Sequence, residues 1–203
     1  MTLSDMNFCS ECGGPLLRHV VATEQRNHWY CPRCLAPRYV SPRIIVTTFV
    51  ALGKSLLWAR RGLEPQLGKW GIPGGFLELG ETLGEGAARE LHEETGIVVP
   101  PEQLQLYMTG SITFINQVYV GFRATVNADS CAPGVESMDC AFFTRDECPW
   151  EEVAYPQVND SIQQAYDDLD SGSFDVWQAE MTDSYYVLRS VSPSAVQPAG
   201  KKR

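Results

Sequence analysis

Glu90, Glu93 and Glu94 are the residues of this chain whose types and spacing best suit chemistry. On a helix, the spacing i, i+3 and i+4 places three carboxylates on one face, with Cβ atoms about 5–6 Å apart. Like charges so close disfavour one another's ionisation, so a cation should lie among them. Arg89 can neutralise one partner only, and a hard divalent ion with oxygen ligands, Mg²⁺ or Mn²⁺, would neutralise the rest. The alternative is an acidic helix face that only contacts solvent, which is as frequent.

The ends of this segment predict the helix that would carry the three glutamates. Thr82 followed three residues later by Glu85 is a capping-box pattern, which predicts a helix that begins just after Thr82. Gly96 is a typical stop, because glycine tolerates the left-handed backbone conformation that commonly ends a helix.

A wider pattern surrounds this helix and extends over residues 75–97. Its fixed positions are Gly75, Glu81, Arg89, Glu90, Leu91, Glu93, Glu94, Gly96 and Ile97, preceded by Trp70-Gly71-Ile72-Pro73-Gly74. Every specified position of the Nudix box is present, so the chain closely resembles the Nudix hydrolase family. The resemblance implies an α/β/α sandwich with a mixed sheet. It also implies a loop-helix-loop that binds divalent cations and hydrolyses a nucleoside diphosphate linked to another group X.

The resemblance assigns roles to individual residues of the box. Glu90 and Glu94 would be the main ligands of the catalytic Mg²⁺ or Mn²⁺, and the carbonyl of Gly74 would be a further ligand. Arg89 would pair with a box carboxylate such as Glu81 and so hold the loop on the helix.

Two carboxylates are candidates for the group that activates water. Glu93 would complete the metal site or accept the proton of the attacking water. In several Nudix enzymes the general base comes from a loop after the box, which makes Glu136, in the acidic loop 134–156, the leading candidate. A solvated loop acid explains Glu136 equally well.

Four further residues are candidates for substrate binding. Arg60 and Arg61 end a predicted strand close, by family analogy, to the diphosphate, although a solvated strand end is an equal alternative. Trp150 or Tyr155 could stack on a base or flavin ring, because ring faces bind planar heterocycles. Either residue could instead fill the core beneath its loop.

A second motif lies near the N-terminus and suggests another metal. Two Cys-x-x-Cys pairs stand 18 residues apart, a spacing typical of a four-cysteine zinc site formed by Cys9, Cys12, Cys31 and Cys34. Four thiolates favour a closed tetrahedral Zn²⁺, which predicts a structural zinc ribbon rather than a redox pair or an accidental spacing. His19 and His28 are expected at the surface, and Cys131, Cys140 and Cys148 as free thiols.

Composition and net charge indicate the compartment and the partners to expect. Hydrophobic residues make up 44% of the 203 residues, charged residues 20%, and the formal net charge is −9. No apolar run approaches the roughly 20 residues of a membrane span and no secretory signal begins the chain, so we expect a cytoplasmic protein without membrane contact. The negative charge disfavours nucleic acid as a partner but permits a small phosphorylated substrate.

Hydrophobic patterning predicts the remaining elements. Apolar and β-branched runs predict strands at 44–52, 55–60, 104–114, 117–126 and 141–144, and helical spacing predicts a helix at 159–169. The first two strands form a hairpin about a turn at Gly53-Lys54.

The predicted domains are a zinc ribbon (1–38), a Nudix hydrolase domain (43–170) and a C-terminal extension (171–203) with a disordered tail from about 190. The aromatic stretch 174–188 has no assigned role; it could pack on the ribbon or on the partner of a homodimer.

The group X is predicted from the resemblance to two Nudix subgroups that carry an N-terminal ribbon. NADH pyrophosphatases have a Ser-Gln-Pro-Trp-Pro-Phe-Pro-x-Ser run after the box, which is lacking after Ile97. The short linker after the ribbon, Pro149-Trp150 and Ala154-Tyr155-Pro156 are more similar to the FAD and ADP-ribose group. We therefore expect a dinucleotide substrate, FAD or ADP-ribose, with NADH as the second choice. A regulator that binds nucleic acid or protein through the ribbon is the alternative from another class, and the intact acidic triad disfavours it.

Overall fold

The computed structural model describes residues 7–21 and 26–191, and the tail predicted from about 190 lies almost wholly outside them. The chain divides into two compact units, Met1–Pro42 and Arg43–Arg203. In the described parts of the chain, no helix is long and apolar enough to cross a membrane.

The first unit is a small three-stranded antiparallel sheet with a cysteine cluster. Its strands are β1 (Leu17–Val21), β2 (Arg26–Cys31) and β3 (Ala36–Arg38), in that order. Cys9, Leu16 and Cys31 form its buried centre. Such a small buried centre among the described residues provides little hydrophobic stabilisation, and small units of this kind commonly depend on a metal.

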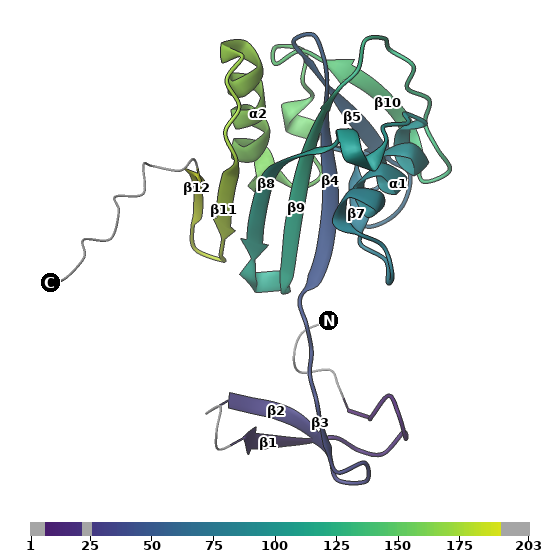
Figure 1. Ribbon diagram of the computed structural model, residues 1–203, viewed down its shortest axis with the longest axis vertical. Helices are drawn as coiled ribbons and strands as arrows, with labels where there is room; N and C mark the ends of the chain where they lie inside the picture. Colours follow the sequence, from purple (N-terminus) through teal and green to yellow (C-terminus); the bar gives the residue numbers. More distant parts are fainter. Residues whose placement is uncertain (1–6, 22–25, 192–203) are drawn as a thin grey trace, which may run out of the picture. The chain divides into compact units, whose positions relative to one another are not determined.

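The second unit is built on one large mixed sheet (Figure 1). Its strands, in spatial order, are β10 (Ser137–Phe143), β5 (Ser55–Arg61), β4 (Arg43–Leu52), β9 (Gln117–Thr125), β8 (Gln105–Ile112), β11 (Trp177–Met181) and β12 (Tyr186–Ser190). Two short strands complete it: β6 (Trp70–Gly71) pairs with β5, and β7 (Gly74–Phe76) pairs with β4. The β4–β9 and β8–β11 pairs are parallel and the other pairs are antiparallel, so the predicted mixed sheet is confirmed.

Two α-helices cover opposite faces of this sheet (Figure 1). They are α1 (Leu83–Thr95) and α2 (Asn159–Ser171), and single 3₁₀ turns lie at Pro101–Gln103, Thr113–Ile115, Trp150–Glu152 and Pro156–Val158. Successive side chains of a strand point to opposite faces. Val46 and Val50 of β4 therefore join the buried cluster of Leu91 on α1, whereas Phe49 joins that of Ile162 on α2. The predicted α/β/α arrangement is confirmed.

The hairpin of β4 and β5 opens just beyond its turn. The two strands pair only at Ala51–Leu56 and Leu52–Ser55. Further along, β7 pairs with β4 at residues 45–47 and β6 pairs with β5 at residues 59–60. The residues just before and at the start of the box thus enter the sheet between two diverging strands, which brings them beside its open end.

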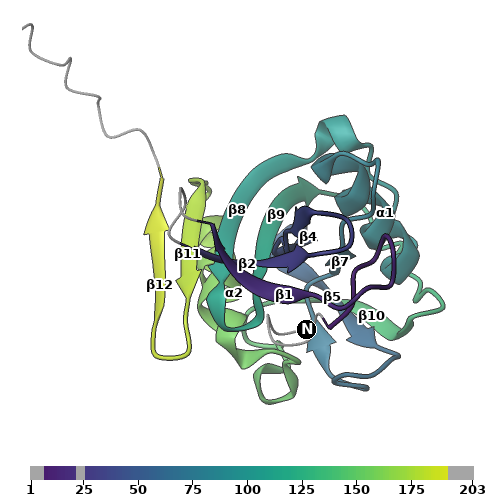
Figure 2. The same cartoon turned by 90° about the horizontal axis from the view of Figure 1, so that it is seen from below.

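Two regions differ from the sequence-based expectation. Strand β10 begins at Ser137 instead of Ala141, because its first half is held by backbone pairing with β5 while Met138 and Asp139 are exposed and show no apolar pattern. The stretch 174–188 contributes β11 and the start of β12, and β12 lies at the outer edge of the main sheet beside β11 (Figure 2). Two of its aromatic residues, Trp177 and Tyr186, thus belong to strands of the main sheet.

Candidate active site

The helix that carries the three glutamates has the predicted ends. The side chain of Thr82 accepts a hydrogen bond of 3.3 Å from the Glu85 N–H, and the Glu85 carboxylate accepts one of 2.7 Å from the Thr82 N–H. Gly96 has the left-handed conformation, with φ of 68°. Both caps satisfy backbone groups that the helix leaves unpaired, and they fix which side of α1 faces the sheet.

Arg89 is the centre of an ion-pair network at the start of the site. Its guanidinium donates two hydrogen bonds to Glu81, of 2.7 and 3.1 Å, which confirms the predicted pair. It also lies 2.9 Å from Glu90 and 2.9 Å from Glu93, and it donates to the carbonyl of Phe76. The expectation that Arg89 neutralises one carboxylate only is therefore wrong, because the five donors of a guanidinium can reach several acceptors at once.

Glu94 points to the strand that precedes the box. Its carboxylate accepts a hydrogen bond of 3.0 Å from the backbone N–H of Gly74. The two glycines of β7 allow this close approach: a Cβ at Gly74 would overlap the backbone of β4, and a Cβ at Gly75 would overlap the carboxylate of Glu90. The Gly74-Gly75 pair therefore lets the helix carboxylates and the strand backbone share one small space.

The surroundings make ionisation of two of the glutamates costly. Burial raises the pKa of Glu94 to about 7, against the opposing hydrogen bond from Gly74, and the negative charge of Glu90 raises it further. Burial also raises the pKa of Glu90, while Arg89 opposes that rise. A divalent ion would offset both effects, so these raised pKa values are consistent with the predicted cation site.

The three glutamates do not form one tight group. Among the described residues, only the four cysteines bring three or more such side chains within metal-binding reach of one another. Glu90 and Glu93 are both turned to Arg89, whereas Glu94 is turned to Gly74. The three carboxylates therefore do not converge on one point, and the side chain of Glu93 is 55% exposed. The assignment of Glu90 and Glu94 as the main metal ligands stays a prediction.

A cleft of about 720 Å³ leads to this site along the α2 face of the sheet. That volume is within the range of about 300–1,000 Å³ that small-molecule sites occupy. Glu94, Gly74 and Gly75 line one part of it, and Arg61 and Tyr155 line another. Arg61 lies 5.8 Å from the ring centre of Tyr155, and its charge also lowers the pKa of Glu94. The predicted residues Arg61 and Tyr155 are therefore placed in one cleft with the box.

Two predicted substrate residues lie elsewhere. Arg60 donates a hydrogen bond of 2.9 Å to the carbonyl of Gly68 and does not line the cleft. Trp150 packs edge-on against Trp58 and Tyr166, with ring centres 5.9 and 6.2 Å apart, and donates its indole N–H to the carbonyl of Arg145. Trp150 thus fits the alternative of a core residue.

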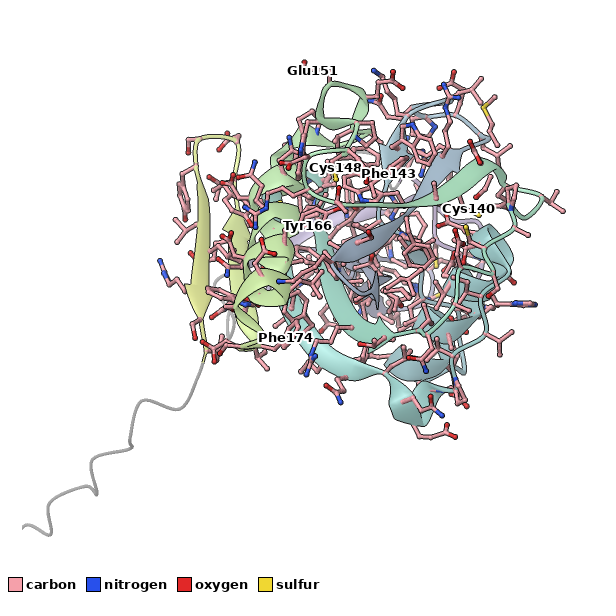
Figure 3. All side chains as sticks on the ribbon, turned by 90° about the horizontal axis from the view of Figure 1, so that it is seen from above. Cys140, Phe143, Cys148, Glu151, Tyr166 and Phe174 are labelled. Carbon is pink, nitrogen blue, oxygen red and sulfur yellow. The ribbon has the colours of Figure 1, made fainter. Side chains whose placement is uncertain are left out.

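Next to Trp150, the hydroxyl of Tyr166 makes hydrogen bonds within the core. Tyr166 of α2 points toward Cys148 and Phe143 (Figure 3), and its hydroxyl lies 2.8 Å from the Cys148 sulfur and 2.8 Å from the Phe143 carbonyl. Trp150 packs edge-on against this tyrosine, which is 1% exposed.

Glu136 lies near the carboxylates of the box. Its negative charge contributes to the raised pKa of both Glu90 and Glu94. The loop before β10 is held against the end of α1, because the N–H of Gly134 donates to the Glu94 carbonyl and the N–H of Gly62 donates to the Glu136 carbonyl. The structure thereby brings Glu136 close to the site, with its side chain exposed.

One wall of the cleft comes from the C-terminal half of the chain and was not predicted from the sequence. Tyr119, Ser161 and Met181 line it, from β9, α2 and β11 respectively. None of these three residues is among the candidate site residues predicted from the sequence, and Ser161 and Met181 belong to no local motif. The one signal was the unexplained aromatic stretch 174–188, which includes Met181.

The second candidate metal site is the cysteine cluster of the first unit. The four sulfur atoms of Cys9, Cys12, Cys31 and Cys34 lie within 4.8 Å of one another. Backbone N–H groups of Gly14 and Cys34 donate to the sulfurs of Cys12 and Cys31, and Arg38 donates to that of Cys9. Such donors favour thiolates, so the donor set and its surroundings fit a bound divalent metal.

The fold and the box define a class of protein, and comparison with known families agrees. Residues 41–169 match the NUDIX domain, so the chain belongs to the Nudix hydrolase family. A solved NUDIX hydrolase from Nitrosomonas europaea is 31% identical and superposes with a TM-score of 0.80, over 87% of this chain and 99% of that one.

Sequence relatives include the NAD-capped RNA hydrolases NudC of Stutzerimonas stutzeri and Vibrio vulnificus, which are 32% and 30% identical. The matches cover 72% and 71% of this chain but 51% and 53% of those proteins, so the chain spans about half the length of these relatives. An ADP-ribose pyrophosphatase of Methanocaldococcus jannaschii is 37% identical over 60 residues, which are 30% of this chain and 36% of that protein.

Proposed function

We propose that this chain is a pyrophosphohydrolase that depends on Mg²⁺ or Mn²⁺ and cleaves the diphosphate of a nucleoside diphosphate linked to another group X. One observation carries the proposal: Glu94, whose pKa is raised to about 7, lies beside Glu90 at a cleft that also contains Arg61. A carboxylate pair of this kind needs a cation, and a cation next to an arginine in a cleft suits a diphosphate.

The donor atoms fit a hard divalent ion. One oxygen of Glu94 accepts from Gly74 and one oxygen of Glu90 accepts from Arg89. Among the described residues, the other oxygen of each side chain accepts no hydrogen bond. Those two oxygens and the Gly74 carbonyl would hold the ion. Once bound, it would offset charge on the leaving oxygen and lower the pKa of a bound water.

The chain's own residues would position the substrate and accept the proton. Arg61 would pair with a phosphate oxygen, and the Tyr155 ring beside it would contact a planar part of the substrate. Glu136 is our candidate for the general base, because it is exposed and close to both Glu90 and Glu94. Glu93 is the second candidate, although Arg89 already holds one of its oxygens.

ADP-ribose is the substrate that we put first. FAD, ADP-ribose and NADH all contain an ADP half, and the relatives bear the names ADP-ribose pyrophosphatase and NAD-capped RNA hydrolase. FAD, which we also expect from the sequence, has no counterpart among those names. NADH is the second candidate, because the relatives that match most of this chain are NAD-capped RNA hydrolases. The products would be AMP and ribose 5-phosphate, FMN or reduced nicotinamide mononucleotide.

We further propose that the cysteine cluster holds a structural Zn²⁺. A closed set of four sulfurs leaves no open position for a substrate. Among the described side chains of this unit, the buried apolar residues are Cys9, Leu16 and Cys31, so metal binding would supply much of its stability.

The experiment is a substrate panel read by mass spectrometry. FAD, ADP-ribose, NADH and deoxynucleoside triphosphates are each incubated with the protein in Mg²⁺ or Mn²⁺, with Glu94→Gln as the control that should lose activity. We expect AMP from ADP-ribose with the second phosphate ester in equal amount. Turnover of triphosphates alone would contradict a dinucleotide substrate.

A further inference from the structure

One wall of the cleft comes from parts of the chain far from the box. Tyr119 of β9, Ser161 and Ile162 at the start of α2, and Met181 of β11 all line it. Apolar side chains such as Ile162 and Met181 suit the faces of a planar ring. A small number of polar groups in such a wall commonly fix the orientation of the ligand.

The polar groups of this wall form a chain of three hydroxyls. The hydroxyl of Tyr119 lies 3.2 Å from that of Ser161, and the Ser161 hydroxyl lies 2.6 Å from that of Tyr186. Tyr119 and Ser161 line the cleft, whereas Tyr186 lies behind Ser161 on β12. Tyr186 is also the strand partner of Met181, so the same two strands supply the apolar contact and the end of the hydroxyl chain.

Packing fixes the positions of the Tyr119 and Ser161 hydroxyls. The Tyr119 ring lies against Gly110 of β8, where a Cβ would overlap the ring carbons. Tyr119 and Ser161 are buried, with relative exposures of 6% and 2%. The two hydroxyls therefore cannot move away from each other without repacking β8, β9 and α2.

The three hydroxyls can make further hydrogen bonds with a ligand. Three hydroxyls carry three protons, and the two hydrogen bonds between them use two. One proton and several lone pairs remain, and rotation of the hydroxyls decides which end of the chain donates. Tyr119 and Ser161 can thus offer the cleft either a donor or an acceptor from one fixed place.

The spacing from the box suits the two ends of an ADP group. Ile45 of β4 pairs with Phe76 of β7 on one side and with Tyr119 of β9 on the other. Neighbouring strands lie about 4.8 Å apart, so β7 and β9 are about 10 Å apart. A diphosphate held near Gly74 would therefore place its base, two strands away, at the Tyr119 wall.

We propose, on the basis of the proposed function, that Tyr119 and Ser161 recognise the polar edge of the adenine base of the substrate and that Tyr186 positions Ser161 for this contact. Adenine presents an amino donor next to a ring nitrogen acceptor on one edge. A hydroxyl pair that donates and accepts matches that edge, and the apolar wall matches its faces. Because all three candidate substrates contain adenine, the inference applies to each.

The test compares two bases on one backbone. Hydrolysis of ADP-ribose and of its hypoxanthine counterpart is measured for the native protein, Tyr119→Phe, Ser161→Ala and Tyr186→Phe, and binding of AMP and IMP is measured by calorimetry. Tyr107→Phe is the matched control: this tyrosine is buried on β8, donates 2.8 Å to Asp168 and does not line the cleft. Thermal unfolding midpoints are recorded for every variant.

We expect Ser161→Ala to lower kcat/KM for ADP-ribose about tenfold, mainly through KM, because one hydrogen bond is lost. The preference for adenine over hypoxanthine should shrink in Ser161→Ala and Tyr119→Phe, and by a smaller factor in Tyr186→Phe. Tyr107→Phe should keep the preference even where its midpoint falls.

The outcomes separate this inference from the proposed function. An unchanged base preference in Ser161→Ala and Tyr186→Phe, with lower midpoints only, overturns the inference and leaves the hydrolase proposal intact. Absence of any dinucleotide hydrolysis by the native protein overturns the proposed function. The ratio of AMP to IMP affinity then still decides whether these hydroxyls recognise adenine.

Discussion

The carboxylate of Glu94 and the backbone N–H of Gly74 are joined by a hydrogen bond of 3.0 Å that ties the end of α1 to strand β7. Glu94 is thus a partly buried acid held by one neutral donor, next to the carboxylate of Glu90. Ionisation of this carboxylate destabilises the metal-free protein, and the loss of stability can be measured.

Replacement of Glu94 by glutamine should stabilise the metal-free protein and abolish hydrolysis. The amide oxygen can still accept from Gly74, but the charge is gone. In the native protein the pKa of Glu94 is raised from 4.5 to about 7, so its contribution to stability is present below about pH 4.5 and is lost as the pH rises to about 7. At pH 8 the variant should therefore be more stable by as much as about 3 kcal/mol.

Chemical denaturation of metal-free protein from pH 4.5 to 8.5 measures this difference. The native protein should lose stability with rising pH more steeply than Glu94→Gln, and added Mn²⁺ should stabilise the native protein only. Parallel pH profiles of the two proteins would contradict the assignment of Glu94 as a metal ligand with a high pKa.

Arg89→Ala should be one of the most destabilising single changes at the site. The side chain of Arg89 is 25% exposed and contacts Glu81, Glu90 and Glu93, so its removal leaves three carboxylates without their common cation. We expect a loss of about 2–4 kcal/mol in the free energy of unfolding. Urea denaturation measures it.

Arg189→Ala is the matched control for that experiment. Arg189 pairs with Glu180 at 3.1 Å, but its side chain is 60% exposed, so its loss should cost less than about 1 kcal/mol. Equal losses in the two variants would show that Arg89 is no more than a surface ion pair.

Gly75→Ala should damage catalysis much more than stability. A methyl group at this position would occupy the space of the Glu90 carboxylate, which can swing aside because it is the end of a flexible side chain. We expect hydrolysis to fall by about 100-fold, as is typical when a group near a metal is misplaced. Gly84→Ala is the control, because its Cβ would meet only Pro101 at ordinary contact distance; it should be neutral or slightly stabilising. Similar activity in the two variants would contradict a role for the Glu90 position.

The sequence predicted the box helix well and the cleft poorly, for a physical reason. The ends of α1 and the Arg89–Glu81 pair depend on residues within a few turns of one another, so their spacing in the sequence determines their geometry. The sequence left two alternatives for Trp150, stacking on a ring of the substrate or filling the core, because its neighbours come from β5 and α2, which are distant in the chain.

The wall of the cleft formed by Tyr119, Ser161 and Met181 could not be predicted from the sequence either. Tyr119 of β9 meets Ser161 because α2 covers that face of the sheet, and Tyr186 reaches Ser161 because the parallel β8–β11 pair brings the C-terminal strands beside the sheet. No local pattern encodes a contact between residues so far apart in the chain. The hydroxyl chain therefore required the structure.

The cysteine cluster gives the last prediction. Cys31 is fully buried and accepts a hydrogen bond from the Cys34 N–H, so Cys31→Ser should remove one of four ligands and release Zn²⁺. We expect the native protein to contain one zinc per chain by elemental analysis, and Cys31→Ser to contain less than about a tenth of that. Cys131→Ser is the control, because its thiol contacts the Cys140 carbonyl in the other unit, and its zinc content should not change.

A chelator should release the zinc of the native protein and lower the stability of residues 1–42 in hydrogen exchange. Hydrolysis in Mg²⁺ should persist, because Glu90 and Glu94 belong to the separate compact unit. Loss of hydrolysis in Cys31→Ser together with retained zinc would contradict a structural role for the cluster.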